Sequence, residues 1–163
     1  LMGKLGSANI DARQDGAADA LCYSAAGDLV AAAGARVGPP GVAAGEGSPV
    51  VELVSATAAA RIAARHADGT VSVWEPGTAE PLATWIVPVA DPGAIGISAD
   101  GTLVSVGSPD GADPSASLCD ALTGAEVRRV EGARVIASAP EPGTLLVAGD
   151  WGCAWMKPLE EDS

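Results

Sequence analysis

The sequence predicts an all-β chain composed of several short antiparallel sheets. Its 163 residues are 48% hydrophobic but include no Phe, so the core must use small and β-branched side chains together with four Trp rings. The 21 Gly and 12 Pro are numerous enough to supply many turns. β-branched runs such as 102–106 lie next to Asp-Gly pairs, which is typical of strands joined by tight turns.

Four segments share one pattern: an apolar strand that contains Ser, a turn of small residues and a second apolar strand. Aligning them on Ser24, Ser55, Ser98 and Ser138 gives spacings of 31, 43 and 40 residues. The last two spacings fit a four-stranded propeller blade, so we expect a partial β-propeller of about three to four four-stranded antiparallel blades. The expected divisions are 1–18 for a linker or the end of a preceding blade, and approximately 19–49, 50–90, 91–131 and 132–163 for the blades.

The first segment departs from the pattern, and the second has a local alternative. Residues 35–49 include Pro39-Pro40 among glycines, which indicates a loop in place of a convincing pair of outer strands. Residues 56–65 are rich in Ala, so a short helix is the main alternative there. We expect a strand, because Asp68-Gly69 follows at the spacing of a hairpin. The residues expected to point inward in this second blade are Val71, Val73 and Trp85.

The third segment has the clearest hairpin. Residues 94–98 and 102–107 are expected to pair through a tight turn at Ala99-Asp100-Gly101. Asp110-Gly111 is expected to end a strand in the same way that Asp68-Gly69 does.

Residues 66–85 resemble the third and fourth strands of a WD repeat. Asp68-Gly69-Thr70-Val71 matches the turn of that family, and Trp74-Glu75 stands where the family has its Trp-Asp pair. Cys119-Asp120 repeats the scheme, and Trp155-Met156 is a third, altered copy. The resemblance covers roughly residues 19–163 and is strongest over 50–131. It implies structural roles in blade cores and turns for Trp74, Asp68, Gly69, Asp100, Gly101, Cys119 and Asp120.

The chain also departs from the family. No Gly-His dipeptide precedes the blades, and at most four blades occur where seven are common in the family. An open arc leaves sheet faces without neighbours, so we expect the remaining blades elsewhere, in the same polypeptide or in a partner. The chain alone is then expected to be a monomer only transiently, or to aggregate.

Catalytic, metal and cofactor sites are not expected. His66 is the single histidine, no Gly-x-Ser-x-Gly elbow accompanies it, and a loop position between blade strands explains it better than a catalytic triad. Asp100, Asp110, Asp113 and Asp120 could suggest calcium, but residues 110–115 lack the spacing of a calcium loop, and turn formation explains the pairs Asp100-Gly101 and Asp110-Gly111. We therefore expect a protein that is not an enzyme and has no cofactor.

Charge and cysteine content limit the partners and the compartment. The net charge of −12 opposes binding to nucleic acid and to anionic membranes. No apolar run approaches the roughly 20 residues that span a bilayer, so no membrane insertion is expected. Three cysteines without a CxxC spacing favour an intracellular, reducing compartment, and we expect a cytoplasmic or cytoskeletal location.

Three residues are candidates for contact with a partner protein. Trp151 lies in a turn-like context beside acidic residues, and exposed Trp is enriched in interfaces. Arg128 and Arg129 form a small basic spot on an expected outer strand, where protection of a sheet edge is the alternative role.

The predicted function is a non-catalytic protein–protein interaction scaffold, or a structural subunit of a larger assembly, that binds through propeller rims and open blade edges. One alternative is a propeller-type ligand sensor or enzyme with a central-channel site, and another is a different fold, an all-β sandwich.

Overall fold

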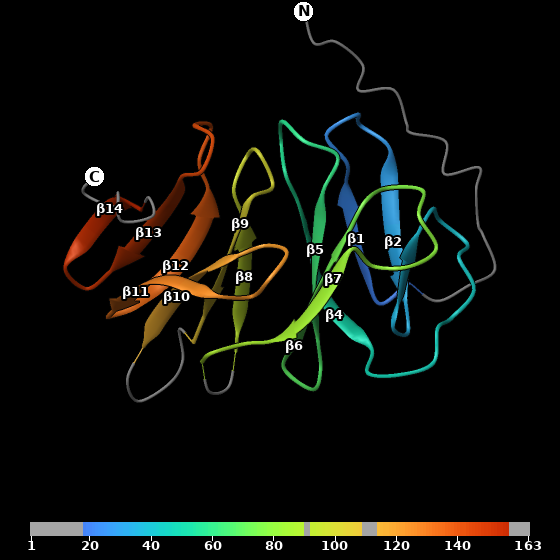
Figure 1. Cartoon of the computed structure of the whole chain (residues 1–163), viewed down its shortest axis with the longest axis horizontal. Helices are drawn as coiled ribbons and strands as arrows, with labels where there is room; N and C mark the ends of the chain where they lie inside the picture. Colours follow the sequence, from blue (N-terminus) through green and yellow to red (C-terminus); the bar gives the residue numbers. More distant parts are fainter. Residues whose placement is uncertain (1–17, 90–91, 109–113, 157–163) are drawn as a thin grey trace, which may run out of the picture.

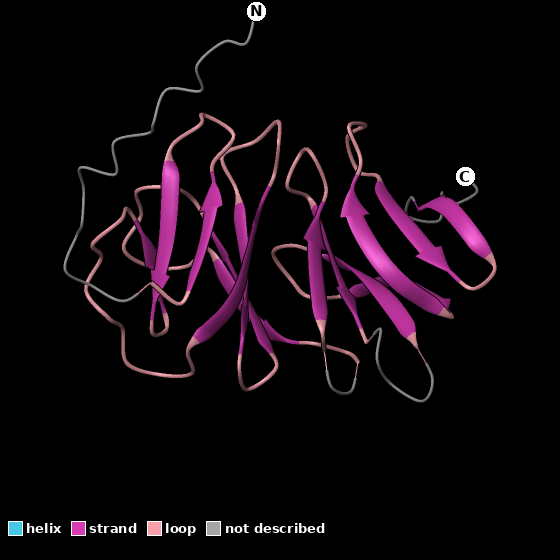
Figure 2. Ribbon diagram, turned by 180° about the vertical axis from the view of Figure 1, so that it is seen from behind, coloured by secondary structure: helices cyan, strands magenta, loops and turns pink. Residues whose placement is uncertain are grey.

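The computed structural model describes residues 18–89, 92–108 and 114–156, and these contain strands and loops only (Figure 2). Within this part of the chain, no helix is long and apolar enough to cross a membrane. Residues 1–17 of the linker expected at 1–18, the Asp110-Gly111 turn and residues 157–163 lie outside the described residues.

In the described part of the chain, fourteen strands form four antiparallel sheets that follow one another along the sequence (Figure 1). Sheet 1 contains β1 (Ala20–Tyr23), β2 (Leu29–Ala33) and β3 (Arg36–Gly38). Sheet 2 contains β4 (Val50–Ser55), β5 (Ile62–His66), β6 (Thr70–Trp74) and β7 (Ala83–Ile86). Sheet 3 contains β8 (Ala94–Ile97), β9 (Leu103–Gly107), β10 (Ser115–Asp120) and β11 (Glu126–Glu131). Sheet 4 contains β12 (Ala133–Ser138), β13 (Leu145–Gly149) and β14 (Gly152–Met156).

The sheets stand side by side in an open arc, with sheet 1 at one end and sheet 4 at the other (Figure 1). The first strands of successive sheets contact one another, β1 with β4, β4 with β8 and β8 with β12. These four strands therefore form the inner side of the arc, and later strands of each sheet extend outward. The all-β, propeller-like architecture expected from the repeat is confirmed.

Three apolar clusters fill the spaces between consecutive sheets, because each strand alternates its side chains between two neighbours. In the second sheet, Ile62 and Trp74 face sheet 1, whereas Val71 and Val73 face sheet 3. Leu145 on β13 packs in turn against sheet 3. The expected inward positions of Val71, Val73 and Trp85 are confirmed, since all three are buried.

Two hydroxyl groups link the inner strands of neighbouring sheets at matching places. Ser55 donates to the carbonyl oxygen of Tyr23, and Ser138 donates to that of Ile97. Each acceptor directly precedes one of the aligned serines, Ser24 or Ser98. The serine alignment therefore corresponds to a physical repeat of the sheets.

Three details correct the expectations. Only sheets 2 and 3 are four-stranded, because sheets 1 and 4 have three strands each within the described residues. Sheet 1 does have one short outer strand, β3, before the Pro39-Pro40 loop begins. Residues 56–65 are neither a helix nor one strand: β5 starts only at Ile62, which pairs with Trp74, and residues 56–61 connect it to β4.

Candidate functional site

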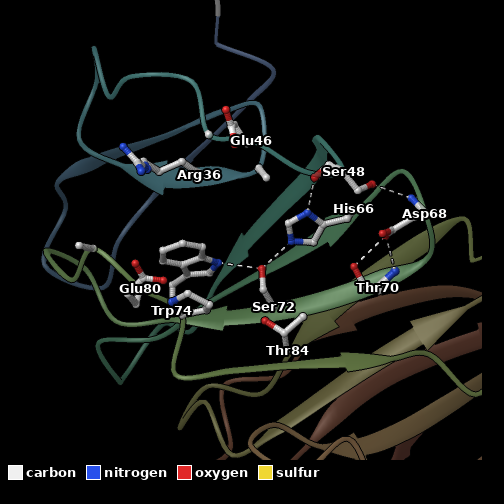
Figure 3. Close-up of a pocket in the computed structure, with 14 residues that line it drawn as sticks. Arg36, Glu46, Ser48, His66, Asp68, Thr70, Ser72, Trp74, Glu80 and Thr84 are labelled. Atoms are coloured by element: carbon white, nitrogen blue, oxygen red, sulfur yellow. Dashed lines mark hydrogen bonds between the residues drawn. The ribbon is translucent and has the colours of Figure 1, made fainter.

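A polar pocket of about 300 Å³ lies beside sheet 2, and its lining includes the single histidine, His66, and Asp68 (Figure 3). His66 ends β5, and Ser72 and Trp74 come from the adjacent strand β6. Ser48 enters from the loop that precedes β4. His66 is thus a buried strand residue, which corrects its expected place in a loop.

The hydrogen bonds around His66 form one continuous chain (Figure 3). Its Nδ1 lies 2.8 Å from the carbonyl oxygen of Ser48, which can only accept, so Nδ1 carries the ring proton. In the neutral ring Nε2 then accepts from the Ser72 hydroxyl at 2.7 Å. The indole Nε1–H of Trp74 donates to the same Ser72 oxygen at 2.8 Å. The side-chain polar atoms of His66, Ser72 and Trp74 therefore all have hydrogen-bond partners.

This geometry is structural in character. A serine nucleophile needs an oxygen that a substrate can reach, and the Ser72 side chain is buried. Its hydroxyl is also held from two sides, by the imidazole and by the indole N–H. The network therefore fixes the Trp74 ring between sheets 1 and 2.

Charged side chains surround the mouth of this pocket. Arg36, Glu46 and Glu80 are exposed there, together with the Asp68 turn (Figure 3). The described residues contain no group of three or more His, Cys, Asp or Glu side chains able to hold a metal ion.

Three of the sequence-predicted residues, Asp68, Asp100 and Asp120, perform the same task in different turns. Each carboxylate accepts a hydrogen bond from the backbone N–H two residues further on, and each also accepts from a threonine hydroxyl. Gly69 and Gly101 follow two of them with φ of +84° and +70°, a region that favours glycine. These aspartates order the turns between strands.

The same hydrogen bonds lower the pKa of each carboxyl group. For Asp68, the largest cause is the backbone N–H of Thr70. Burial on its own would raise the pKa of Asp100 and of Asp120. The combined hydrogen bonds, from Ser98 and Thr102 in the first case and mainly from Thr123 in the second, outweigh burial and hold both below the ordinary value.

Cys119 is fully buried on β10, the third strand of sheet 3, and corresponds to Trp74 on the third strand of sheet 2. Cys119 faces sheet 2 as Trp74 faces sheet 1, so the two residues lie in equivalent environments one sheet apart. Burial, with a further contribution from Glu126, raises the pKa of the Cys119 thiol to about 12. The group is a small core residue at neutral pH.

The two adjacent arginines have different surroundings. Arg129 forms an ion pair with Glu126 at 2.9 Å and also donates to the carbonyl oxygen of Pro88 at 3.0 Å, which ties sheet 3 to the segment after β7. Glu126 also accepts from the Ser117 hydroxyl. Arg128 instead lines a groove of about 280 Å³ between β11 and sheet 4.

Trp151 lies at this same groove, as do Val130 and Val147. Its indole N–H donates to the carbonyl oxygen of Glu131, and its ring lies against Gly132 and Gly149. The ring is folded back onto its own sheet yet remains 48% exposed. The structure therefore brings Trp151 and Arg128 together, and their role in partner binding stays a prediction.

Sequence reasoning missed the joint action of Ser48, His66 and Ser72. One signal was present: Ser72 and Trp74 are two residues apart on a strand and therefore share a face. The contribution of Ser48, 18 positions before His66, had no local signal.

Comparison with known proteins identifies the fold. Neither the protein-family models nor the curated protein sequences contain a match to this chain. Among solved structures, the chain is similar to the β-propeller domain of Cps50 (Swd1) from Myceliophteria thermophila, with a TM-score of 0.60 and 17% sequence identity. The match covers 83% of this chain and 50% of the other, so the chain spans about half the length of that propeller domain. The architecture is that of a partial propeller, in agreement with the resemblance to WD repeats.

Proposed function

We propose that this chain is a non-catalytic protein–protein interaction scaffold, a structural subunit of a larger assembly that it contacts through the ends and rims of the arc. Propellers of the WD-repeat type typically serve as interaction scaffolds, and the chain has that fold. Fold alone does not fix function, so the proposal depends on a feature of this chain's own surface.

That feature is the apolar character of the two terminal sheet faces. On β1, Ala20 and Cys22 pack against sheet 2, so Leu21 and Tyr23 point the other way and are 57% and 67% exposed. On sheet 4, Ile136 and Val147 pack against sheet 3, so Val135 lies on the opposite face and is 58% exposed. The corresponding faces inside the arc are buried, so these two ends have the chemistry of sheet interfaces that lack their neighbour.

We propose that further blades or a partner protein cover these faces. The charge of −12 favours a neutral or basic partner and disfavours nucleic acid. The cysteines Cys22, Cys119 and Cys153 are free thiols, which is compatible with the reducing cytoplasmic or cytoskeletal location that we propose.

The test compares self-association and partner recovery for three proteins. Sedimentation velocity and affinity purification with mass spectrometry are carried out on the wild type, on the double variant Tyr23→Ser/Val135→Ser, and on Leu122→Ser. Leu122 is the matched control, because it is 47% exposed but lies in a turn of sheet 3.

The wild type and the control should self-associate or recover the same partner proteins, whereas the double variant should be a monomer that recovers fewer. A wild-type chain that is a clean monomer with a sharp, reversible thermal transition and no partner would contradict the proposal.

A further inference from the structure

Sheet 1 ends one strand earlier than sheets 2 and 3. After β3 the chain turns through Pro39 and Pro40, and it continues as a loop to β4. Sheet 2, in contrast, adds the fourth strand β7, which carries Trp85. The space between sheets 1 and 2 therefore lacks the outer strand that the next space along the arc contains.

Trp85 shows what such an outer strand contributes. It is buried in the cluster between sheets 2 and 3, in company with Val104, Cys119 and Ala121. Its indole N–H donates to the carbonyl oxygen of Ala121 at 3.0 Å. Its ring lies so close to Gly124 that no Cβ would fit there. One aromatic ring thus closes the outer part of this sheet-to-sheet interface.

At the interface between sheets 1 and 2, the equivalent walls enclose a groove of about 500 Å³. Ile62 and Trp74 form a cross-strand pair that corresponds to the pair of Val104 and Cys119. Pro76, two positions after Trp74, corresponds to Ala121, two positions after Cys119. The groove is lined by these counterparts of the residues around Trp85, and by side chains of sheet 1 on the other side. The main lining residues are Val30, Val37, Ile62, Trp74, Pro76 and Gly77.

The groove differs from its filled counterpart in two ways. Gly77, in the turn that follows β6, has open space where a Cβ would stand, whereas Gly124 in the corresponding turn meets Trp85. The rim carries the exposed carboxylates Asp28 and Glu75, and among the described residues no cationic side chain lines the groove. Its volume lies within the roughly 300–1,000 Å³ that is usual for ligand pockets.

We propose that this groove binds an extended segment of a partner protein, which inserts one large aromatic side chain between sheets 1 and 2 and places basic residues beside Asp28 and Glu75. The inserted ring occupies the place that Trp85 occupies at the next interface. Apolar walls supply the affinity and the acidic rim selects a basic segment. This inference rests on the proposed function, because it names the partner chemistry of one surface of the same scaffold.

The probe is a fluorescein-labelled peptide that presents the sequence of β7, Ala-Thr-Trp-Ile, between two pairs of lysines. Fluorescence anisotropy gives its Kd for the full chain. A second peptide has Ala in place of Trp and the same charge. We expect the Trp peptide to bind at least about tenfold more tightly, since a buried aromatic anchor typically supplies a large share of the binding energy of such a contact.

Two charge-reversal variants with the same net charge locate the site. Asp28→Lys/Glu75→Lys changes the groove rim, whereas Glu46→Lys/Glu80→Lys changes the mouth of the polar pocket beside sheet 2. The first should weaken binding of the Trp peptide about tenfold or more, and the second should have a much smaller effect. Equal binding of the two peptides, or equal weakening by the two variants, would overturn the inference.

Two other occupants of the groove would give different experimental results, and either result would also overturn the inference. Peptide binding that appears only after deletion of residues 1–17 would assign the groove to the chain's own segment. A dimer in sedimentation velocity that dissociates on Asp28→Lys/Glu75→Lys would assign it to a second copy. Failure here leaves the scaffold proposal intact if Tyr23→Ser/Val135→Ser still abolishes partner recovery, so the two failures are distinguishable.

Discussion

The indole N–H of Trp74 donates to the hydroxyl oxygen of Ser72, two positions earlier on the same strand. Through that oxygen the ring is coupled to His66 and then to the Ser48 backbone. Trp74 is the residue at which the resemblance to a WD repeat is clearest, and its orientation is set by a buried serine and histidine.

Replacement of Ser72 by alanine should therefore destabilise the chain by about 1–3 kcal/mol, because it leaves the indole N–H and the His66 Nε2 without partners in a buried site. Urea unfolding followed by Trp fluorescence measures the loss. The matched control is Ser105→Ala on β9. The Ser105 hydroxyl is the buried side-chain polar atom without a hydrogen-bond partner among the described residues. Its removal should be neutral or stabilising, and a loss as large as that of Ser72→Ala would contradict this view.

The turns after β6 and β10 allow a second comparison. Gly77 and Gly124 have φ of +88° and +70°, so alanine at either position should cost about 1–2 kcal/mol in backbone strain. Gly124→Ala should cost clearly more than Gly77→Ala, because its Cβ would collide with the Trp85 ring while that of Gly77 enters open space. Equal unfolding free energies for the two variants would show that Trp85 does not fill the outer interface.

Thiol reactivity should differ sharply between cysteines of the native chain. Burial, together with Glu126, raises the pKa of Cys119 to about 12, so almost no thiolate exists at about pH 8. Cys153 is exposed on the edge strand β14 and should react first with a disulfide reagent. Absorbance followed over time after addition of the reagent distinguishes the Cys153 thiol from the Cys119 thiol, with Cys153→Ser as the control. Cys119 should react only after denaturant is added.

Acid should destabilise the fold through the turn aspartates. The hydrogen bonds from Ser98 and Thr102 outweigh burial and hold the pKa of Asp100 below its ordinary value. The unfolded chain then binds more protons than the folded one, so this contribution is present above about pH 4 and is lost as pH falls through the lower folded-state pKa. In the variant Asp100→Asn, the free energy of unfolding should decrease less between about pH 4 and 2 than it does in the wild type.

The sequence pattern was sufficient to predict the sheets but not all of their strands. Period-two alternation and Asp-Gly turns indicated β6, β8 and β9, because both signals are local. The Ala-rich residues 56–65 illustrate the limit. Helix propensity and strand formation compete there, and the outcome depends on the pairing of Ile62 with Trp74, which brings residues 12 apart together.

The candidate site was harder to predict, because its contacts join distant segments. Asp68 and Asp100 were expected in turns and lie in turns, since each bonds to a residue two positions away. The burial of His66 depends on Ser48, and the groove between sheets 1 and 2 depends on a strand that the chain does not form after Gly38. Composition can indicate a loop but not the empty volume beside it.

The uncovered ends of the arc also have a kinetic consequence. Among the described residues each sheet packs against the sheets next to it, so opening can start at sheet 1 or sheet 4 without disturbing the middle of the chain. A molecule that caps Tyr23 or Val135 would raise the free energy of that first step. The lifetime of the protein in the cell would then depend on assembly, because a copy without a bound partner unfolds locally from its ends and is cleaved preferentially by proteases.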